Sequence, residues 1–489
     1  MFIGRDKLQY SCIAMNELRD LCLHAFQAAI DGAQPYQRVR DTLCLTNGCV
    51  KVGQRIYQVN HNIHLAAFGK AALDMVRGAE DTLDDHIIEG IASVPRGTLQ
   101  KLKNINLRTK FLEGATNNLP DENACNNARL IEEMAERLQT SNDIFLVLVS
   151  GGGSALLSAP ISSISLDDKR KTINAMTSRG ADIKQVNIVR IALSRLKGGK
   201  LAQIAHPAKI LAIIVSDVVG DSLEFIASGP TVISPDKYDP VIILKRLNAW
   251  DAIPSSVQAA LSEPYKMNSA HDIEHIDVHN TIVANNKSAL LGASEVLRKN
   301  GYQCHVVNTA VMEDANLFGF QLANIINALI AGKSFYQALQ SANMISNNTA
   351  PYGDKTALLF GGECTVTVKG SGKGGRNQQI VLAALSKLLE QSNFGQEKVE
   401  FALMSAGTDG QDGPTDAAGA VLTSNDMQYF LEVGSQWKKT VIDEYIDNND
   451  SYNFWKKFNN GKSHIIFGPT GTNVMDVQSG LPPILLNMI

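Results

Sequence analysis

Short, uninterrupted apolar runs alternate along this chain with longer stretches in which apolar residues recur every three or four positions. Continuous runs of four to eight residues are typical of parallel strands that are covered on both faces, and the longer periodic stretches are typical of helices. The clearest helix is expected at 121–139, where Pro120 precedes it and acidic residues occupy its first turn. The pattern predicts an α/β protein with mainly parallel sheets.

The expected elements fall into two series. Strands are predicted at His64–Phe68, Ile87–Val94, Ile144–Val149 and Ala208–Val215, and then at Thr281–Ala284, His305–Val307, Ala357–Phe360, Thr365–Val368, Phe401–Ser405 and His464–Phe467. Helices of the second series are predicted at Lys287–Asn300, Ala315–Ala331 and Asn377–Glu390.

A change of texture between the two series predicts the domain boundary. Prolines and short polar segments replace the regular alternation from about 234 to 280, and 489 residues suggest two or three domains. We therefore expect a Rossmann-like domain at 1–275 and a second α/β domain at 276–467, with the segment 468–489 packing back on the first and a cleft between the domains.

Composition excludes several classes of function. The 45 basic and 49 acidic residues give a net charge of −4, so no basic field attracts nucleic acid or a membrane surface. The apolar runs are far shorter than the roughly 20 residues of a membrane span. Seven scattered cysteines without a C-x-x-C pair argue against a disulfide framework and for a reducing compartment. The expected location is the cytoplasm, with a mitochondrial form left open, and a homo-oligomer is also left open.

The most informative stretch is KGSGKGGRNQQ at 369–379, between an alternating run and a helical one. Glycines permit positive φ and uncover backbone N–H groups, and the following helix presents its positive end. Two lysines and an arginine add full charges, so the loop predicts a polyphosphate site. The residues expected to bind this cofactor are Gly370, Gly372, Lys373, Gly374 and Gly375, followed by Arg376.

The same string also matches G-x-G-x-x-G, the dinucleotide fingerprint. An NAD-dependent hydroxy-acid dehydrogenase is therefore an alternative, although no acidic residue follows cleanly at the end of a second strand. A non-enzymatic phosphosugar-binding module is a third interpretation.

Two glycine motifs follow predicted strands in the first half. SGGGS at 150–154 places three glycines and two hydroxyls at the end of a buried strand, where open α/β sheets bind ligands. GKAA at 69–72 places a lysine at the first turn of a helix, where it can meet an anion, although the pattern alone more often marks a solvated lysine. The candidates are Gly151, Gly152, Gly153 and Ser154, as a cradle for a phosphate or a substrate carboxylate, together with Lys70 and, beside a glycine pair, Lys197.

Carboxylates and hydroxyls follow other predicted strands. Asp217 and Asp221 suit Mg²⁺, which takes one or two carboxylates together with phosphate oxygens and water, but they suit the capping of the next helix equally well. The candidates for substrate contacts are Glu363 in GGEC, Asp409 and Asp412 in TDGQDGPTD, and Thr470 and Thr472 in GPTGTNV, for which a plain turn is the alternative.

Taken in order, these motifs resemble the class II glycerate kinases, whose C-terminal half is called the MOFRL domain. The resemblance spans nearly the whole chain and includes SGGGSALL, SRLKGGKLA, IASGPT, GGECTVTVKGSGKGGRNQQ and TDGQDGPTDAAGA. It implies two α/β domains and ATP-dependent phosphorylation of D-glycerate to 2-phosphoglycerate, with Lys70 and Arg376 in catalysis. One departure is the stretch TNNLPD at 116–121, where bacterial relatives carry GHPxPD.

With that resemblance, the expected mechanism is phosphoryl transfer by alignment and charge. The loop 370–375 and Mg²⁺ are expected to hold ATP, Arg376 and Lys70 to flank the migrating phosphoryl group, and 151–154 with Asp409 and Asp412 to seat the glycerate. The carboxylate that receives the hydroxyl proton is open among Asp217, Asp221, Glu363 and Asp409.

Overall fold

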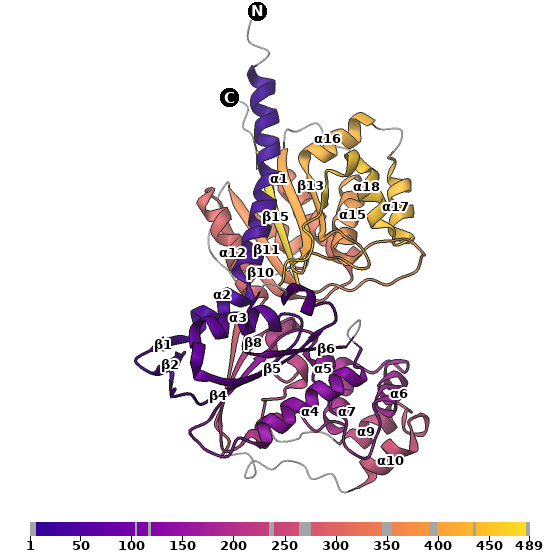
Figure 1. Cartoon of the computed structure of the whole chain (residues 1–489). Coiled ribbons are helices and arrows are strands. Elements are labelled where there is room, and N and C mark those ends of the chain that lie inside the picture. Colours follow the sequence, from indigo (N-terminus) through magenta and orange to yellow (C-terminus); the bar gives the residue numbers. More distant parts are fainter. Residues whose placement is uncertain are drawn as a thin grey trace, which may run out of the picture. The chain divides into compact units, whose positions relative to one another are not determined.

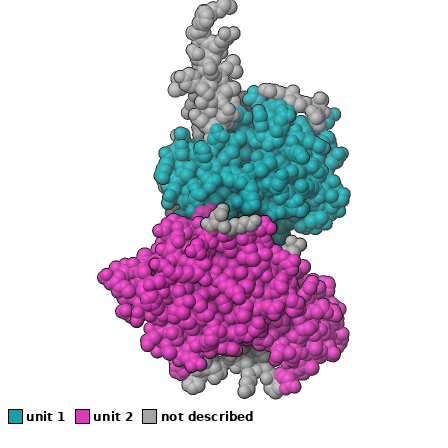
Figure 2. Space-filling view, in the orientation of Figure 1, with its two compact units in different colours: residues 1–33, 285–489 teal, residues 34–284 magenta. Residues whose placement is uncertain are grey.

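The computed structural model describes residues 6–102, 105–115, 119–233, 239–263, 275–344, 355–390, 399–433 and 437–485. They form two compact units: unit 1 contains residues 1–33 and 285–489, and unit 2 contains residues 34–284 (Figure 2). The α/β class is confirmed, with helices packed on a six-stranded sheet in each unit (Figure 1).

Unit 2 is built on a six-stranded sheet with the order β6-β5-β4-β7-β8-β9, in which every neighbouring pair is parallel. The predicted strands of the first half are all present, and β7 is buried at every position, as expected for a central strand between two helical layers. The strands are β4 (Ile63–Phe68), β5 (Ile87–Pro95), β6 (Lys110–Gly114), β7 (Ile144–Val149), β8 (Lys209–Val215) and β9 (Val278–Ala284).

The helices of unit 2 cover this sheet and form a smaller cluster beside it. α4 begins after Asp121, whose side chain accepts the N–H of Ala124 as an N-cap, so the predicted start of this helix is confirmed. α6, α7, α9 and α10 share a separate apolar core. The helices are α2 (Pro35–Thr42), α3 (Ala72–Leu83), α4 (Glu122–Glu136), α5 (Gly153–Leu156), α6 (Leu166–Thr177), α7 (Ile183–Ala192), α8 (Lys200–Ala205), α9 (Pro240–Arg246) and α10 (Ser255–Ser262).

Unit 1 has a mixed sheet with the order β10-β11-β15-β12-β13-β14. Only β10 and β11 pair in parallel, and the other four neighbouring pairs are antiparallel, so the prediction of mainly parallel strands is wrong for this sheet. The strands are β10 (Gln303–Val311), β11 (Thr356–Gly362), β12 (Val399–Gly407), β13 (Gly419–Thr423), β14 (His464–Ile465) and β15 (Asp476–Leu485).

Helix α1 belongs to unit 1 together with the C-terminal half of the chain. A single domain boundary near residue 275 therefore does not describe the two units. Helix α1 packs along α12, and the two helices approach closely because a Cβ on Gly292 would lie 2.2 Å from the carbonyl oxygen of Ala28. Arg19 of α1 also pairs with the fully buried Asp426 at 2.6 Å. The helices of unit 1 are α1 (Asp6–Gly32), α12 (Asn286–Lys299), α13 (Ala315–Ile330), α14 (Phe335–Ser341), α15 (Arg376–Leu388), α16 (Ser424–Val433), α17 (Lys439–Asp447) and α18 (Ser451–Lys457).

Three further expectations are corrected. The C-terminal segment is part of unit 1, where β15 is an interior strand of the sheet between β11 and β12; of the predicted first domain it contacts residues 6–33, as in the bond from Thr472 to Ala33. The predicted strand 281–284 belongs to β9 and thus to unit 2. The stretch 365–368 forms no strand and makes a single bridge from Thr365 to Asp314, since its exposed Val368 has no sheet neighbour to cover it.

Candidate functional site

Three loops of unit 2 leave the same edge of its sheet. β4, β7 and β8 are adjacent parallel strands, so the residues that follow them meet at their carboxyl ends, where open α/β sheets bind ligands. These residues are 69–71, 150–154 and 216–221, and they include the predicted Lys70, glycine cradle and Asp217.

The first two loops interlock. Gly69 has a φ of 128° and a Cβ there would lie 2.1 Å from the Oγ of Ser150, so only glycine fits. The N–H of Lys70 donates to the carbonyl of Gly151 at 2.8 Å, and the N–H of Ala71 donates to the Oγ of Ser150 at 3.1 Å. These bonds fix the backbone of Lys70 while its side chain stays exposed.

Asp217 lies against the glycine cradle. A Cβ on Gly151 would lie 2.1 Å from the Oδ2 of Asp217, so the carboxylate touches the cradle backbone. Burial raises the pKa of Asp217, and the positive charge of Lys70 opposes that shift. The N–H groups of Gly151 and Gly152 have no acceptor among the described residues. A lysine, a carboxylate and two open N–H groups therefore share this edge.

The wall of the cradle is held in unusual backbone conformations. Ser154 and Ser228 place their hydroxyl oxygens 3.2 Å apart. Ala227 and Ser228 have positive φ values of 51° and 64°, and such strain in non-glycine residues concentrates at functional sites. Sequence analysis missed Ser228, and its only signal was the Ser-Gly-Pro turn.

Lys197 supports this wall. Its ammonium group is fully buried and donates to the carbonyl oxygens of Ser154 at 2.9 Å, Leu157 at 3.3 Å and Ala227 at 3.5 Å. An ammonium group has three donors, and all three are engaged by carbonyl oxygens here, so the contact of Lys197 with substrate stays a prediction. Lys197 joins the cradle to the 226–228 turn.

In unit 1, the glycine-rich loop binds another segment of the same chain. The N–H groups of Gly370 and Ser371 donate to the Oδ1 atoms of Asn449 and Asn448, and that of Gly372 donates to the carbonyl of Asn448. The N–H of Lys373 donates to the Oδ1 of Asp450 at 2.8 Å. The predicted polyphosphate cradle at Gly370, Gly372 and Lys373 is therefore not what these residues form.

The glycines are required here because the two segments nearly touch. Cβ atoms on Gly370, Gly372 and Gly374 would lie 2.3–2.4 Å from atoms of residues 448–451. The ammonium of Lys373 lies 4.2 Å from the ring centre of Tyr452, which is a cation–π contact. The dinucleotide interpretation is also weakened, since β11 (Thr356–Gly362) ends seven residues before the loop and does not lead directly into it. Gly374 and Gly375, whose N–H groups have no acceptor among the described residues, remain beside Arg376.

Arg376 opens α15 and is held by two carboxylates. Its guanidinium donates to Asp476 through Nε at 2.5 Å and Nη2 at 2.8 Å, and its Nη1 lies 3.0 Å from Glu363. Burial alone would lower the pKa of Arg376, but Asp476, Glu363 and Asp412 together raise it. Asp476 is completely buried and was not predicted, because no motif marked the residues that follow GPTGTNV.

Asp412 caps the N-terminus of α15. Its Oδ1 accepts the N–H of Asn377 at 3.0 Å, and its Oδ2 accepts the N–H of Gln378 at 2.9 Å. The positive end of this helix, expected to attract a phosphate, is thus occupied by a buried carboxylate, and the substrate contact of Asp412 stays a prediction. Burial raises the pKa of Asp412 to about 6.

Asp409 remains at the open side of the group. A Cβ on Gly407 would lie 3.3 Å from the Oδ1 of Asp409 and 3.4 Å from the Oδ1 of Asp476, so both carboxylates are neighbours of the same glycine. Glu363, Arg376, Asp409 and Asp476 therefore gather at one place in unit 1.

Thr470 and Thr472 hold the chain and do not offer hydroxyl protons to a substrate. Thr470 donates its hydroxyl proton to the carbonyl of Thr408 at 2.6 Å. Thr472 donates to the carbonyl of Ala33 at 2.8 Å and is 4% exposed. Both are turn or packing residues, which was the alternative interpretation.

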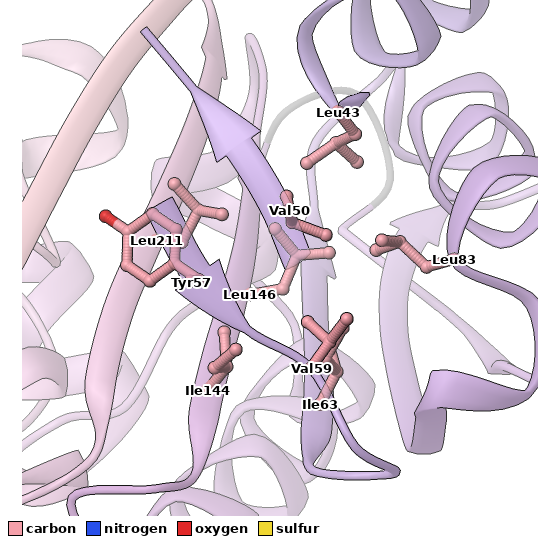
Figure 3. A pocket seen from close by; sticks show the side chains of 9 residues that line it. All are labelled: Leu43, Val50, Tyr57, Val59, Ile63, Leu83, Ile144, Leu146 and Leu211. Carbon is pink, nitrogen blue, oxygen red and sulfur yellow. The ribbon is translucent and has the colours of Figure 1, made fainter. Parts of the chain in front are cut away.

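A small apolar cavity in unit 2 is unsuited to an anionic ligand (Figure 3). It lies between the hairpin strands β1 (Cys44–Thr46), β2 (Cys49–Val52) and β3 (Arg55–Gln58) and the main sheet. Its one hydroxyl, that of Tyr57, lies 3.2 Å from the Nδ1 of His279. The lining residues are Leu43, Val50, Tyr57, Val59, Ile63, Leu83, Ile144, Leu146 and Leu211.

Among the described residues, none of the helices could span a membrane. No group of three or more histidine, cysteine or acidic side chains among the described residues is arranged to hold a metal ion. The divergent stretch at 116–118 lies outside the described residues.

Comparison with known proteins places the chain in a family. Residues 21–262 match a family described as a domain of unknown function, DUF4147, and residues 356–476 match the MOFRL family. Glycerate kinase of Rattus norvegicus is 37% identical over 93% of this chain and 91% of its own length. Glycerate 2-kinase of Pyrococcus horikoshii is 32% identical over 95% and 97%. The chain belongs to the class II glycerate kinase family.

Solved structures agree with this assignment. The crystal structure of glycerate kinase from Thermotoga maritima has a TM-score of 0.78 and 29% identity, and covers 96% of this chain and 100% of its own. A structure from Pyrococcus horikoshii has a TM-score of 0.77 and 30% identity, covering 95% and 98%. The resemblance inferred from the motifs is confirmed.

Proposed function

We propose that this glycerate kinase family member transfers the γ-phosphoryl group of ATP to D-glycerate and forms 2-phosphoglycerate and ADP. The observation that carries the proposal is the sheet edge of unit 2, where Lys70, Asp217 and the open N–H groups of Gly151 and Gly152 meet. The names of the relatives support glycerate as acceptor, and the name of the Pyrococcus horikoshii relative supports its 2-hydroxyl.

Each group has a role in the proposed reaction. The N–H groups of Gly151 and Gly152 bind an anionic oxygen, as N–H groups at strand ends do. Lys70 and Arg376 supply positive charge to the migrating phosphoryl group, whose transition state spreads charge over three oxygens. Asp476 and Glu363 orient the guanidinium of Arg376.

Mg²⁺ would enter with ATP and neutralise its phosphate oxygens. Of the two predicted ligands, Asp217 fits better, because its carboxylate lies against the open cradle. Asp221 has one carboxylate oxygen buried from solvent. One or two carboxylates with phosphate oxygens are sufficient for this ion.

The described cysteines favour a reducing compartment. All six of them are free thiols, which suits the cytosol better than a secretory compartment. We propose a cytoplasmic location on that ground.

A single coupled reaction tests the product. The protein is mixed with MgATP, D-glycerate and enolase, and phosphoenolpyruvate is followed without a mutase. Immediate enolase turnover is expected, since enolase accepts only the 2-phosphate. If turnover begins only after phosphoglycerate mutase is added, the product is the 3-phosphate and the regiochemistry proposed here is wrong. A Lys70→Met variant purified in parallel controls for contaminating kinases and should lose activity.

A further inference from the structure

Unit 2 contains a group of buried cations that the proposed reaction does not use. Lys169 of α6 is only 5% exposed, and its Nζ has no hydrogen-bond partner among the described residues. Arg190 of α7 also makes no hydrogen bond or ion pair within the described part of the chain and is only partly exposed. A buried ammonium without a partner lowers the stability of the fold. An anionic partner would offset that cost.

The surroundings of Lys169 are positive on nearly every side. The groups whose charge acts on Lys169 are Arg190 on α7, the thiol of Cys125 on α4 and Lys200 at the start of α8. The positive charges of Lys169 and Arg190 also act on the ammonium group of Lys197. No carboxylate acts on Lys169, Arg190 or Lys197 within the described residues.

Acidic side chains on α4 and α6 have other partners. Asp168 closes the capping box of α6 with Ser165. Glu132 accepts Nε and Nη2 of Arg195 at 2.9 and 2.6 Å. The cations therefore cannot be neutralised from within this cluster, and mutual repulsion remains.

We propose that Lys169 and Arg190 form a binding site for a small oxyanion, either the carboxylate of the acceptor substrate or free phosphate. A lysine supplies a compact point charge and an arginine supplies a planar pair of donors, which is the combination that carboxylate and phosphate oxygens accept. The substrate source rests on the proposed function, whereas the phosphate source does not.

Lys197 connects this cluster to the cradle. Its ammonium donates to the carbonyl of Ser154, whose hydroxyl lies beside that of Ser228, and also to Ala227. Lys197 therefore joins the charges of Lys169 and Arg190 to the turn that carries Ala227 and to the backbone of Ser154.

The pH dependence of anion binding follows from the protonation of Lys169. Burial, with Arg190 as the next cause, lowers the pKa of Lys169 to about 8. A bound anion favours the charged form, so binding takes up protons near pH 8. Affinity is highest below that pH and falls as the pH rises above it.

Calorimetric titration of the full-length protein without nucleotide tests the site. D-glycerate and inorganic phosphate are titrated separately into the wild type, Lys169→Met and Lys171→Met. Lys171 is the matched control, since it is an exposed lysine of the same helix paired with Asp167. Loss of one charge-assisted contact should weaken binding by about 10- to 100-fold in Lys169→Met, with no change in Lys171→Met.

The outcomes separate the two sources. Weaker binding of D-glycerate in Lys169→Met supports a substrate carboxylate site, and weaker binding of phosphate alone supports a free-anion site. Unchanged affinity for both ligands in a folded Lys169→Met, or no binding of either by the wild type, overturns the proposal. Arg190→Gln provides the same test if Lys169→Met does not fold. A wild type that binds through Lys169 but forms no ADP would refute the proposed function and leave this site standing.

Discussion

The buried pairing of Arg376 with Asp476 makes a sharp prediction for Asp476→Asn. The substitution keeps the shape of the side chain and removes its charge, so one of the two guanidinium bonds, at 2.5 and 2.8 Å, meets an amide N–H₂. Asp476 is fully buried, and removal of one partner from a buried pair costs about 3–5 kcal/mol. Glu363 is 45% exposed, so it restores about 1 kcal/mol or less. We expect a loss of about 3 kcal/mol in the free energy of unfolding of unit 1.

Turnover should fall as well if Arg376 has the catalytic role proposed above, because its guanidinium would lose the carboxylate that orients it. A drop in kcat on the order of 10-fold or more is expected, against about 10²–10³ for Arg376→Ala. Urea unfolding followed by tryptophan fluorescence reports on unit 1 through Trp437 and Trp455, and the steady-state rate of ADP formation gives kcat. Glu363→Gln is the matched control, since it removes the same charge from the same arginine at an exposed position. Equal, small effects of the two variants on both quantities would refute the reasoning.

Three further variants test the structural roles of Gly374, Thr472 and Asp412. Gly374→Ala places a Cβ 2.3 Å from the Oγ of Ser451, so thermal unfolding should occur at a lower temperature even with no nucleotide; an unchanged Tm with a raised KM for ATP would favour a phosphate loop instead. Thr472→Val removes the bond to Ala33 and should cost about 1–2 kcal/mol of stability with KM for glycerate unchanged; a raised KM at unchanged stability would restore the substrate role. Asp412 has a pKa of about 6 in the folded protein against an ordinary value of 3.8. It should therefore stabilise unit 1 most below pH 4, and roughly 3 kcal/mol of that contribution should be lost as the pH rises through 6. In urea titrations from pH 4 to 7, Asp412→Asn should lack this component, and parallel pH profiles of the two proteins would contradict it.

Buried strands could be predicted where the apolar sequence of the strand itself is sufficient to identify it. β4, β7 and β8 are almost continuous apolar runs, and parallel strands buried on both faces require such runs. β15 carries Pro482 and Pro483 and a polar Gln478–Ser479 pair, so its composition does not mark an interior strand. Its place depends on pairing with β11 and β12, which are distant in sequence. For the same reason, nothing near residue 285 indicates that α1 joins the second half.

The candidate site was predicted best where function depends on backbone geometry at strand ends. Lys70, Gly151 and Asp217 follow three strands whose adjacency decides their meeting, and each strand was visible in the sequence. Asp476 was invisible because its importance comes from a partner 100 residues away in sequence.

The glycine-rich loop shows why composition alone misleads about phosphate binding. Glycine leaves a backbone N–H accessible, but accessibility permits any acceptor, and a protein acceptor tethered nearby competes with a ligand. Here Asn448, Asn449 and Asp450 lie at the end of α17, and their oxygens accept four of these N–H groups together with that of Lys369. Close approach of two backbones and close approach of a phosphate demand the same residue type. The two functions differ only in what occupies the space, which a single sequence does not record. The N–H groups of Gly151 and Gly152 have no acceptor among the described residues, whereas in the glycine-rich loop this holds only for Gly374 and Gly375. We therefore propose the anion contact at 151–152.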